Sequence, residues 1–105
     1  GHGPHVARAI ELYKGRLIAY SLGNFCTYAR FNLSGPNGLA PIVKVYTNTQ
    51  GEFLHGQIFS AQQLGEGGAT LDSQHRALKK IQYLSQHDFP DNKLQILDNG
   101  ELLLK

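Results

Sequence analysis

The sequence has 105 residues, of which 41% are hydrophobic, and this fits one small globular domain rather than two. Its formal charge of +2 comes from ten Lys and Arg against eight Asp and Glu, scattered along the chain, which argues against nucleic acid or an anionic membrane as a partner. Cys26 is the single cysteine, so an intrachain disulfide is excluded; we expect this residue to be partly buried as a small apolar side chain. No apolar run reaches the ~20 residues of a membrane-spanning helix, so we expect the chain as given to be soluble.

The first quarter of the chain predicts a short helical turn followed by a hairpin. Apolar residues at helical spacing favour one helical turn over residues 6–9, although a strand is also compatible with the end of this stretch. Two apolar runs, Ile10–Tyr13 and residues 17–24, then flank a glycine-containing turn, which is typical of a hairpin. Residues 26–38 contain the turn-forming run Asn-Leu-Ser-Gly-Pro-Asn-Gly, and we expect a loop there.

The middle of the chain predicts a second hairpin. The strands Ile42–Thr47 and Phe53–Phe59 are rich in β-branched and aromatic residues and are separated by Asn-Thr-Gln-Gly. Gly56 inside the second strand indicates a bulge or a close backbone approach. Residues 60–69 contain three glycines and little apolar surface, so we expect an exposed connector.

The last third predicts one helix and a closing hairpin. A helix is expected over residues 72–86, with Asp72 or Ser73 capping its backbone N–H groups. Its apolar stripe, which should lie on the sheet, consists of Leu71, Ala77, Leu78, Ile81 and Leu84. Residues 94–97 and Glu101–Leu104 flank Asp-Asn-Gly, a strong hairpin turn. The fold class is therefore α+β, a mostly antiparallel sheet of hairpins with one packed helix in residues 1–105.

Two histidines near the start of the chain are candidate metal ligands. His2 and His5 are three residues apart, and one turn of the backbone between them brings both imidazoles within reach of a common ion. The alternative is a polar chain terminus. No carboxylate lies near His2 in the sequence, and a metal needs at least three protein ligands. His55, His75 and His87 are expected at exposed polar positions.

The segment Tyr-Ser-Leu-Gly-Asn-Phe, residues 20–25, ends the first predicted hairpin. Asn24 either lines a site with its amide or simply turns the chain together with Gly23. Ser21 lacks the strand-to-helix elbow of an activated serine, which argues against a serine hydrolase. The glycines at 67 and 68 lack the lysine of a phosphate-binding loop, so nucleotide binding has no support.

Three stretches together resemble the last motif block of the bacterial capsule-synthesis family of the CapA type, the poly-γ-glutamate synthesis proteins, which are related to calcineurin-like metallophosphoesterases. They are Gly-His-Gly-Pro-His-Val at residues 1–6, Ile-Glu-Leu-Tyr-Lys-Gly at 10–15 and Ile-Ala-Tyr-Ser-Leu-Gly-Asn-Phe at 18–25. Weaker likenesses continue to the closing strand near Gly100.

The resemblance implies that the chain is the C-terminal part of a larger domain of four α/β/β/α layers. It further implies that His2 and His5 bind divalent Mn or Zn ions in the parent protein, with Asn24 supporting a ligand or lining the site. The spacing here is His-x-x-His, as in the capsule family, rather than the His-x-His of the wider superfamily. The remaining ligands are expected upstream, so this segment alone is not expected to hold the metal centre or to be active. The resemblance also places the parent at the membrane, facing outside the cytoplasmic membrane.

Two functions therefore stand side by side. In the first, the parent is a metal-dependent phosphoesterase that serves capsule polymer synthesis, and this chain supplies two histidine ligands. In the second, the chain is a non-catalytic α+β module that packs on the upstream part of the same chain or on another capsule-synthesis protein. A homodimer through a sheet edge left bare is a further expectation.

Overall fold

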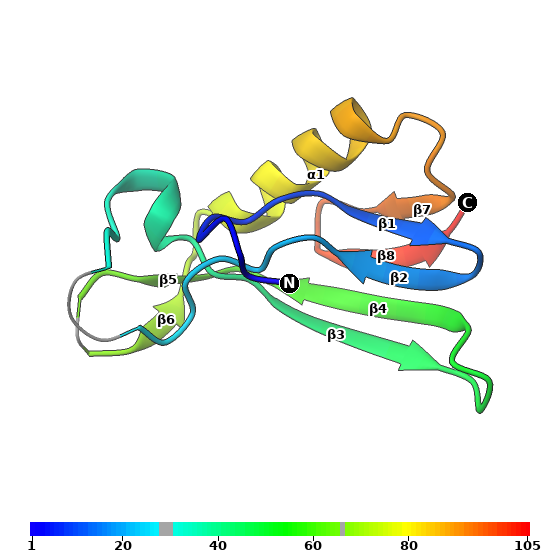
Figure 1. The fold of residues 1–105 in the computed structure, drawn as a ribbon, viewed down its shortest axis with the longest axis horizontal. Coiled ribbons are helices and arrows are strands. Elements are labelled where there is room, and N and C mark those ends of the chain that lie inside the picture. Colours follow the sequence, from blue (N-terminus) through cyan, green and yellow to red (C-terminus); the bar gives the residue numbers. More distant parts are fainter. Residues whose placement is uncertain (28–30, 66) are drawn as a thin grey trace.

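The fold was analysed in a computed structural model that describes residues 1–27, 31–65 and 67–105. Its elements in chain order are β1 (Ile10–Tyr13), β2 (Arg16–Ala19), the 3₁₀ helix η1 (Gly35–Gly38), β3 (Ile42–Thr47), β4 (Phe53–Phe59), β5 (Ala61–Gln63), β6 (Ala69–Leu71), α1 (Arg76–Asp88), β7 (Leu94–Ile96) and β8 (Glu101–Leu104) (Figure 1). All strand pairs are antiparallel, which confirms the α+β class predicted from the sequence.

The strands form one four-stranded sheet and two separate hairpins. The larger sheet has the order β3-β4-β8-β7, so the second and last predicted hairpins lie side by side. Gly56 is where they meet: it pairs with Leu102, and a Cβ atom at position 56 would lie 2.6 Å from the Lys44 carbonyl oxygen. The predicted close backbone approach is confirmed at this residue, while the register shift of the β3–β4 pair lies between Tyr46 and Thr47.

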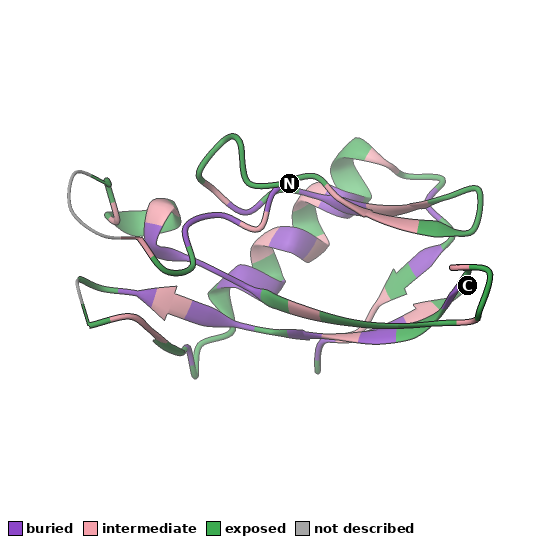
Figure 2. Ribbon diagram, turned by 60° about the horizontal axis from the view of Figure 1, so that its bottom comes forward, coloured by how far each residue is buried: buried purple, intermediate pink, exposed green. Residues whose placement is uncertain are grey.

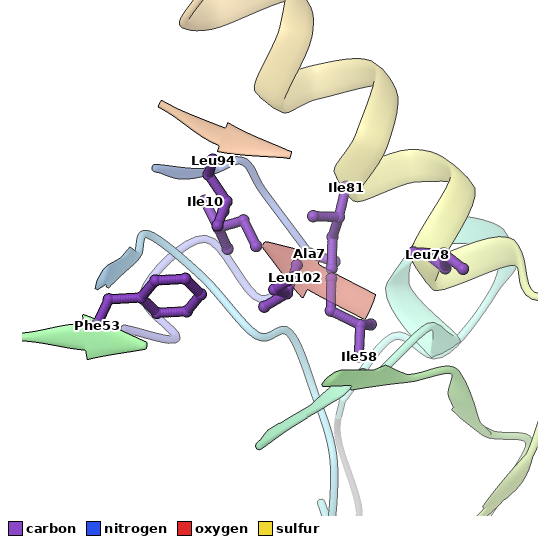
Figure 3. Packing of buried hydrophobic residues seen from close by; sticks show 8 residues of the cluster. All are labelled: Ala7, Ile10, Phe53, Ile58, Leu78, Ile81, Leu94 and Leu102. Atoms are coloured by element: carbon purple, nitrogen blue, oxygen red, sulfur yellow. The ribbon is translucent and has the colours of Figure 1, made fainter. Parts of the chain in front are cut away.

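The hairpin β1–β2 and helix α1 lie on one side of the four-stranded sheet (Figure 2). The turn between β1 and β2 uses Lys14 at φ 51° and Gly15 at φ 77°, the two positive φ values of a type I′ turn. Side chains from both layers fill the space between them, as Figure 3 shows. The buried cluster consists of Ala7, Ile10, Phe53, Ile58, Leu78, Ile81, Leu94 and Leu102.

Two buried side chains, one in α1 and one in the loop after it, bind the backbone of β1. The Ser85 hydroxyl of α1 accepts a hydrogen bond from the Ile10 N–H at 3.0 Å. Asn92 accepts from the Leu12 N–H at 3.1 Å and donates to the Ile10 carbonyl oxygen at 3.0 Å. These bonds occupy backbone groups on the outer edge of β1, which would otherwise be free to pair with another chain.

Several boundaries differ from the sequence prediction because long-range contacts decide them. Residues 6–9 form no helical turn; Ala7 instead makes a β-bridge with Leu22, and β2 ends at Ala19 rather than at residue 24. Cys26 is exposed, as is its neighbour Phe25, so the expectation of a partly buried cysteine was wrong. The stretch 60–69 is not a plain exposed connector, because β5 and β6 pair there and Gln63 is buried.

Helix α1 begins later than predicted. His75 precedes it in a left-handed conformation at φ 53°, so residues before it lie off the helix and Leu71 is 75% exposed rather than part of the buried stripe. Asp72 still caps the helix: its carboxylate accepts hydrogen bonds from the N–H groups of Gln74 and Arg76, both at 3.1 Å. Among the described residues, no helix is long and apolar enough to cross a membrane.

Candidate metal-binding loop

The loop of residues 1–6 lies against the segment that follows β2. The Gly1 nitrogen donates to the Ala19 carbonyl oxygen at 2.8 Å, and the Leu22 N–H donates to the Gly1 carbonyl oxygen at 2.9 Å. A Cβ atom at position 1 would lie 2.5 Å from the Tyr20 carbonyl oxygen, so the two backbones touch closely. Two of the three stretches that carry the family resemblance, residues 1–6 and 18–25, are thus in direct contact.

Gly23 allows the segment that follows β2 to approach the backbone at the end of the loop closely. Its φ of 70° lies in the left-handed region, and a Cβ atom there would lie 2.8 Å from the Leu39 carbonyl oxygen and 3.3 Å from the Ala7 nitrogen. The buried Ser21 hydroxyl accepts from the Gly23 N–H at 3.3 Å, so this serine supports the turn. The tight bend turns the Gly23 carbonyl toward the loop.

The imidazole of His2 is held by one of its two nitrogens. His2 Nδ1 lies 3.0 Å from the carbonyl oxygen of Gly23. Because a carbonyl oxygen only accepts, Nδ1 must carry the proton, and the lone pair of the neutral ring is then on Nε2. A ring N–H bound to a backbone carbonyl is the arrangement that fixes the tautomer of metal-ligating histidines. His2 as a whole is exposed.

His5 is fixed through its backbone and the face of its ring. Its N–H donates to the His2 carbonyl oxygen at 3.0 Å, which closes a turn between the two histidines, and its φ is 62°. The imidazole stacks on Phe31, with 5.4 Å between ring centroids and 23° between ring planes. The backbone therefore turns between His2 and His5, as two ligands of one metal ion would need.

Asn24 joins the loop to a third segment. Its side chain is 5% exposed and donates to the His5 carbonyl oxygen at 3.1 Å and to the Asn37 carbonyl oxygen at 3.2 Å. Asn37 belongs to η1, so one amide connects the loop of residues 1–6 with the end of the region that was predicted as a loop, residues 26–38. The structure therefore brings His2, His5 and Asn24 together, with Asn24 contacting the backbone of one histidine.

The other histidines lie elsewhere. His55 stacks on Tyr46 across the β3–β4 pair at 4.2 Å, and His87 lies 2.9 Å from Asp88 at the end of α1. In the ranges that the structure describes, no group of three or more His, Cys, Asp or Glu side chains is placed to hold a metal ion. The loop contains two imidazoles, fewer than the three protein ligands that a zinc site needs.

A hollow of about 260 Å³ lies at the C-terminal end of α1, away from the loop. Its lining includes Gln82, Phe89 and Gln95, and the polar groups at its base, Ser85 and Asn92, already bind the backbone of β1. This hollow therefore adds no donor to the histidine pair.

Phe31 is a residue of this region that sequence reasoning did not assign to the site. It is 26 positions from His5, so no local spacing relates the two. A weak signal in the sequence is the spacing of Phe25, Tyr28 and Phe31 among polar residues, and Tyr28 lies outside the described residues.

The comparisons with known proteins concern the N-terminal part of the chain. Residues 1–29 match the family model described as Bacterial capsule synthesis protein PGA_cap, and this range contains both histidines and Asn24. Twenty-five residues are 72% identical to two proteins of Sinorhizobium fredii (strain NBRC 101917 / NGR234), "Uncharacterized protein y4sH" and "Uncharacterized protein y4uA". That segment is 24% of this chain and 5% of each relative. The family match supports involvement in capsule synthesis.

Proposed function

We propose that this chain is the C-terminal segment of a capsule-synthesis protein that resembles metal-dependent phosphoesterases, and that His2 and His5 are two of its metal ligands. The observation that supports the proposal is the bond between His2 Nδ1 and the Gly23 carbonyl oxygen, which leaves Nε2 as the free donor. The match of residues 1–29 to the capsule-synthesis family supports the biological context.

The donor chemistry fits a divalent transition metal. Imidazole suits Zn²⁺ well and serves in mixed nitrogen and oxygen sites for other divalent ions such as Mn²⁺. When bound, a pair of such ions supplies Lewis-acid stabilisation for charge on phosphoryl oxygens. The part of this chain is to present two imidazoles: Gly23 orients the ring of His2, and Asn24 fixes the backbone of His5.

The remaining ligands, which would include carboxylates, belong in this proposal to an upstream part of the same chain. The exposed positions of His2 and His5 agree with this, because the histidines face away from the core and are open to a covering segment. Other proposed partners are further capsule-synthesis proteins, and the parent is proposed to be membrane-associated and to face outside the cytoplasmic membrane. Self-association through a sheet edge remains a prediction; β3, at the end of the four-stranded sheet, offers such an edge.

The test is hydrolysis of p-nitrophenyl phosphate and bis(p-nitrophenyl) phosphate by the full-length protein with Mn²⁺ or Zn²⁺. We expect metal-dependent activity that the double change His2→Ala and His5→Ala abolishes. The matched control replaces His55 and His87 by Ala, two exposed histidines far from the loop, and should leave activity within twofold. Activity unaffected by the first double change overturns the proposal. In that case the non-catalytic module is tested by capsule formation, which would survive the loss of both histidines.

A further inference from the structure

The two histidines of the loop are oriented by different means. The edge of the His2 ring is fixed by a hydrogen bond to Gly23, whereas the ring of His5 makes no hydrogen bond within the described part of the chain. The imidazole of His5 instead stacks on the phenyl ring of Phe31. The orientation of His5 therefore depends on an aromatic face rather than on a polar partner.

A neighbour stacked on the face of the imidazole leaves both ring nitrogens able to bind a metal ion. The lone pair that binds a metal lies in the plane of the ring, so a partner that covers one face blocks neither nitrogen. The two planes are 23° apart with centroids at 5.4 Å, which is the offset-stacked geometry that aromatic rings favour. The stack restricts rotation of the side chain, which a metal ion would otherwise have to restrict on binding.

Phe31 is itself held relative to His5. The segment that follows it turns through a hydrogen bond from the Ser34 N–H to the Asn32 side chain at 3.0 Å and leads into η1. The Asn37 carbonyl of η1 accepts from Asn24, the same amide that binds the His5 carbonyl. The ring of His5 therefore contacts the same segment, residues 31–38, to which Asn24 links the His5 backbone.

We propose that Phe31 is a positioning residue for His5, holding its imidazole in the orientation in which it binds a divalent metal ion. This inference rests on the proposed function of the loop and adds to it a residue outside the family match, which ends at position 29. Phe31 is 43% exposed and lies outside the buried cluster, so a replacement there leaves the core unchanged.

The test compares two replacements of Phe31 in the 105-residue chain with ¹⁵N-labelled histidine. Phe31→Leu keeps apolar bulk but removes the aromatic face, whereas Phe31→Tyr keeps the face. Zn²⁺ is added while the ring resonances of all five histidines are followed. Two imidazoles without the upstream ligands are expected to bind one ion weakly rather than to form the complete metal centre, so an apparent Kd is fitted from the shifts of His5 and of His2. A matched control, Tyr46→Leu, removes the corresponding stack on His55, where no metal role is proposed.

The expected result is a Kd for Zn²⁺ about 2- to 10-fold weaker in Phe31→Leu, the range that a stacked aromatic pair contributes. Phe31→Tyr and Tyr46→Leu should stay within twofold of the unchanged chain. Without metal, the upfield ring-current shift of the His5 ring protons should vanish in Phe31→Leu and persist in Phe31→Tyr. In a His5→Ala background, Phe31→Leu should add no further loss.

Two kinds of failure are distinguishable. If the unchanged chain responds at His2 and His5 and Phe31→Leu binds Zn²⁺ equally well, the role of Phe31 is refuted while the proposed function stands. A loss of the same size in the His5→Ala background also refutes it, because Phe31 would then act on the fold in general. If the unchanged chain shows no selective response at either histidine, the metal role of the loop fails and this inference fails with it.

Discussion

Replacing Asn24 tests how firmly the loop is attached to the rest of the chain. The side chain is 5% exposed and donates two hydrogen bonds, one to the His5 carbonyl and one to the Asn37 carbonyl. Asn24→Ala removes both, and at about 1 kcal/mol for each buried bond the free energy of unfolding should fall by about 2 kcal/mol. For a domain of this size, this corresponds to a melting temperature lower by roughly 8 °C.

Asn24→Asp sharpens the test because it keeps the shape and removes both donors. The carboxylate would face two carbonyl oxygens, so its ionised form is disfavoured in the folded state and the folded pKa of Asp at this position lies above the usual ~3.9. The loss of stability should therefore grow as pH rises from about 4 to 7 and should be smallest below pH 4, where the acid is protonated in both states. The control Asn37→Asp adds the same charge in the contacted segment but leaves both bonds of Asn24 in place.

Thermal and urea unfolding at pH 3.5 and pH 7 provide the assay. The predicted order of stability at pH 7 is unchanged chain, Asn37→Asp, Asn24→Ala and Asn24→Asp, with the last two clearly separated from the first two. An Asn24→Ala chain as stable as the unchanged one would show that this amide does not hold the loop, and the proposed support of His5 would be wrong.

Two further predictions concern the bend of the loop and the start of the helix. Gly23→Ala should lower the free energy of unfolding by at least ~2 kcal/mol, because a left-handed φ costs a non-glycine residue about 1–2 kcal/mol and the new Cβ atom would lie 2.8 Å from the Leu39 carbonyl oxygen. Urea unfolding measures this loss. In the control Gly3→Ala the new Cβ atom meets no atom within 4 Å, so stability should change by less than ~0.5 kcal/mol. Burial by itself would raise the pKa of Asp72, but hydrogen bonds from the Arg76 side chain and from backbone N–H groups outweigh burial and lower the pKa below its ordinary value of 3.8. Its charge therefore stabilises the fold above that value and loses this effect as pH falls through the lowered pKa. Asp72→Asn should cost about 1–2 kcal/mol at pH 7, and the cost should shrink as pH falls below 3.8. A pH-independent difference would contradict this reasoning.

Local patterns predict most of the fold because its hairpins are short-range. The alternation in Ile42–Thr47 and Phe53–Phe59 and the Asn-Gly turn before β8 are properties of neighbouring residues, and both hairpins form as expected. The β5–β6 pair was missed because β5 is only three residues long and contains two glutamines. Gln63 is buried there only because its amide binds Thr27 and Gly65 at positions that no local pattern reveals.

In the candidate site too, the sequence indicates the residues but not the long-range contacts between them. The residues His2, His5 and Asn24 follow from the family resemblance, and the close approach at Gly23 follows from its being glycine. What the sequence does not contain is which atoms meet: the bond from His2 to Gly23 spans 21 positions, and the stack of His5 on Phe31 spans 26. Such contacts arise when the loop docks on the folded segment after β2, which is a tertiary event.

The central claim, that residues 1–6 form a preformed pair of metal donors, is tested most directly by adding Mn²⁺ and Zn²⁺ to the chain and to its His2→Ala/His5→Ala variant. The imidazole resonances of all five histidines report on the ions, with Mn²⁺ seen by paramagnetic broadening and Zn²⁺ by shifts. The complete centre needs the upstream ligands, but the account predicts that the pair alone binds an ion weakly. It therefore predicts saturable changes confined to His2 and His5 in the unchanged chain, with His2 responding at Nε2, and their loss in the variant. Equal, unsaturable changes at every exposed histidine, or a response of His2 at Nδ1, would contradict it.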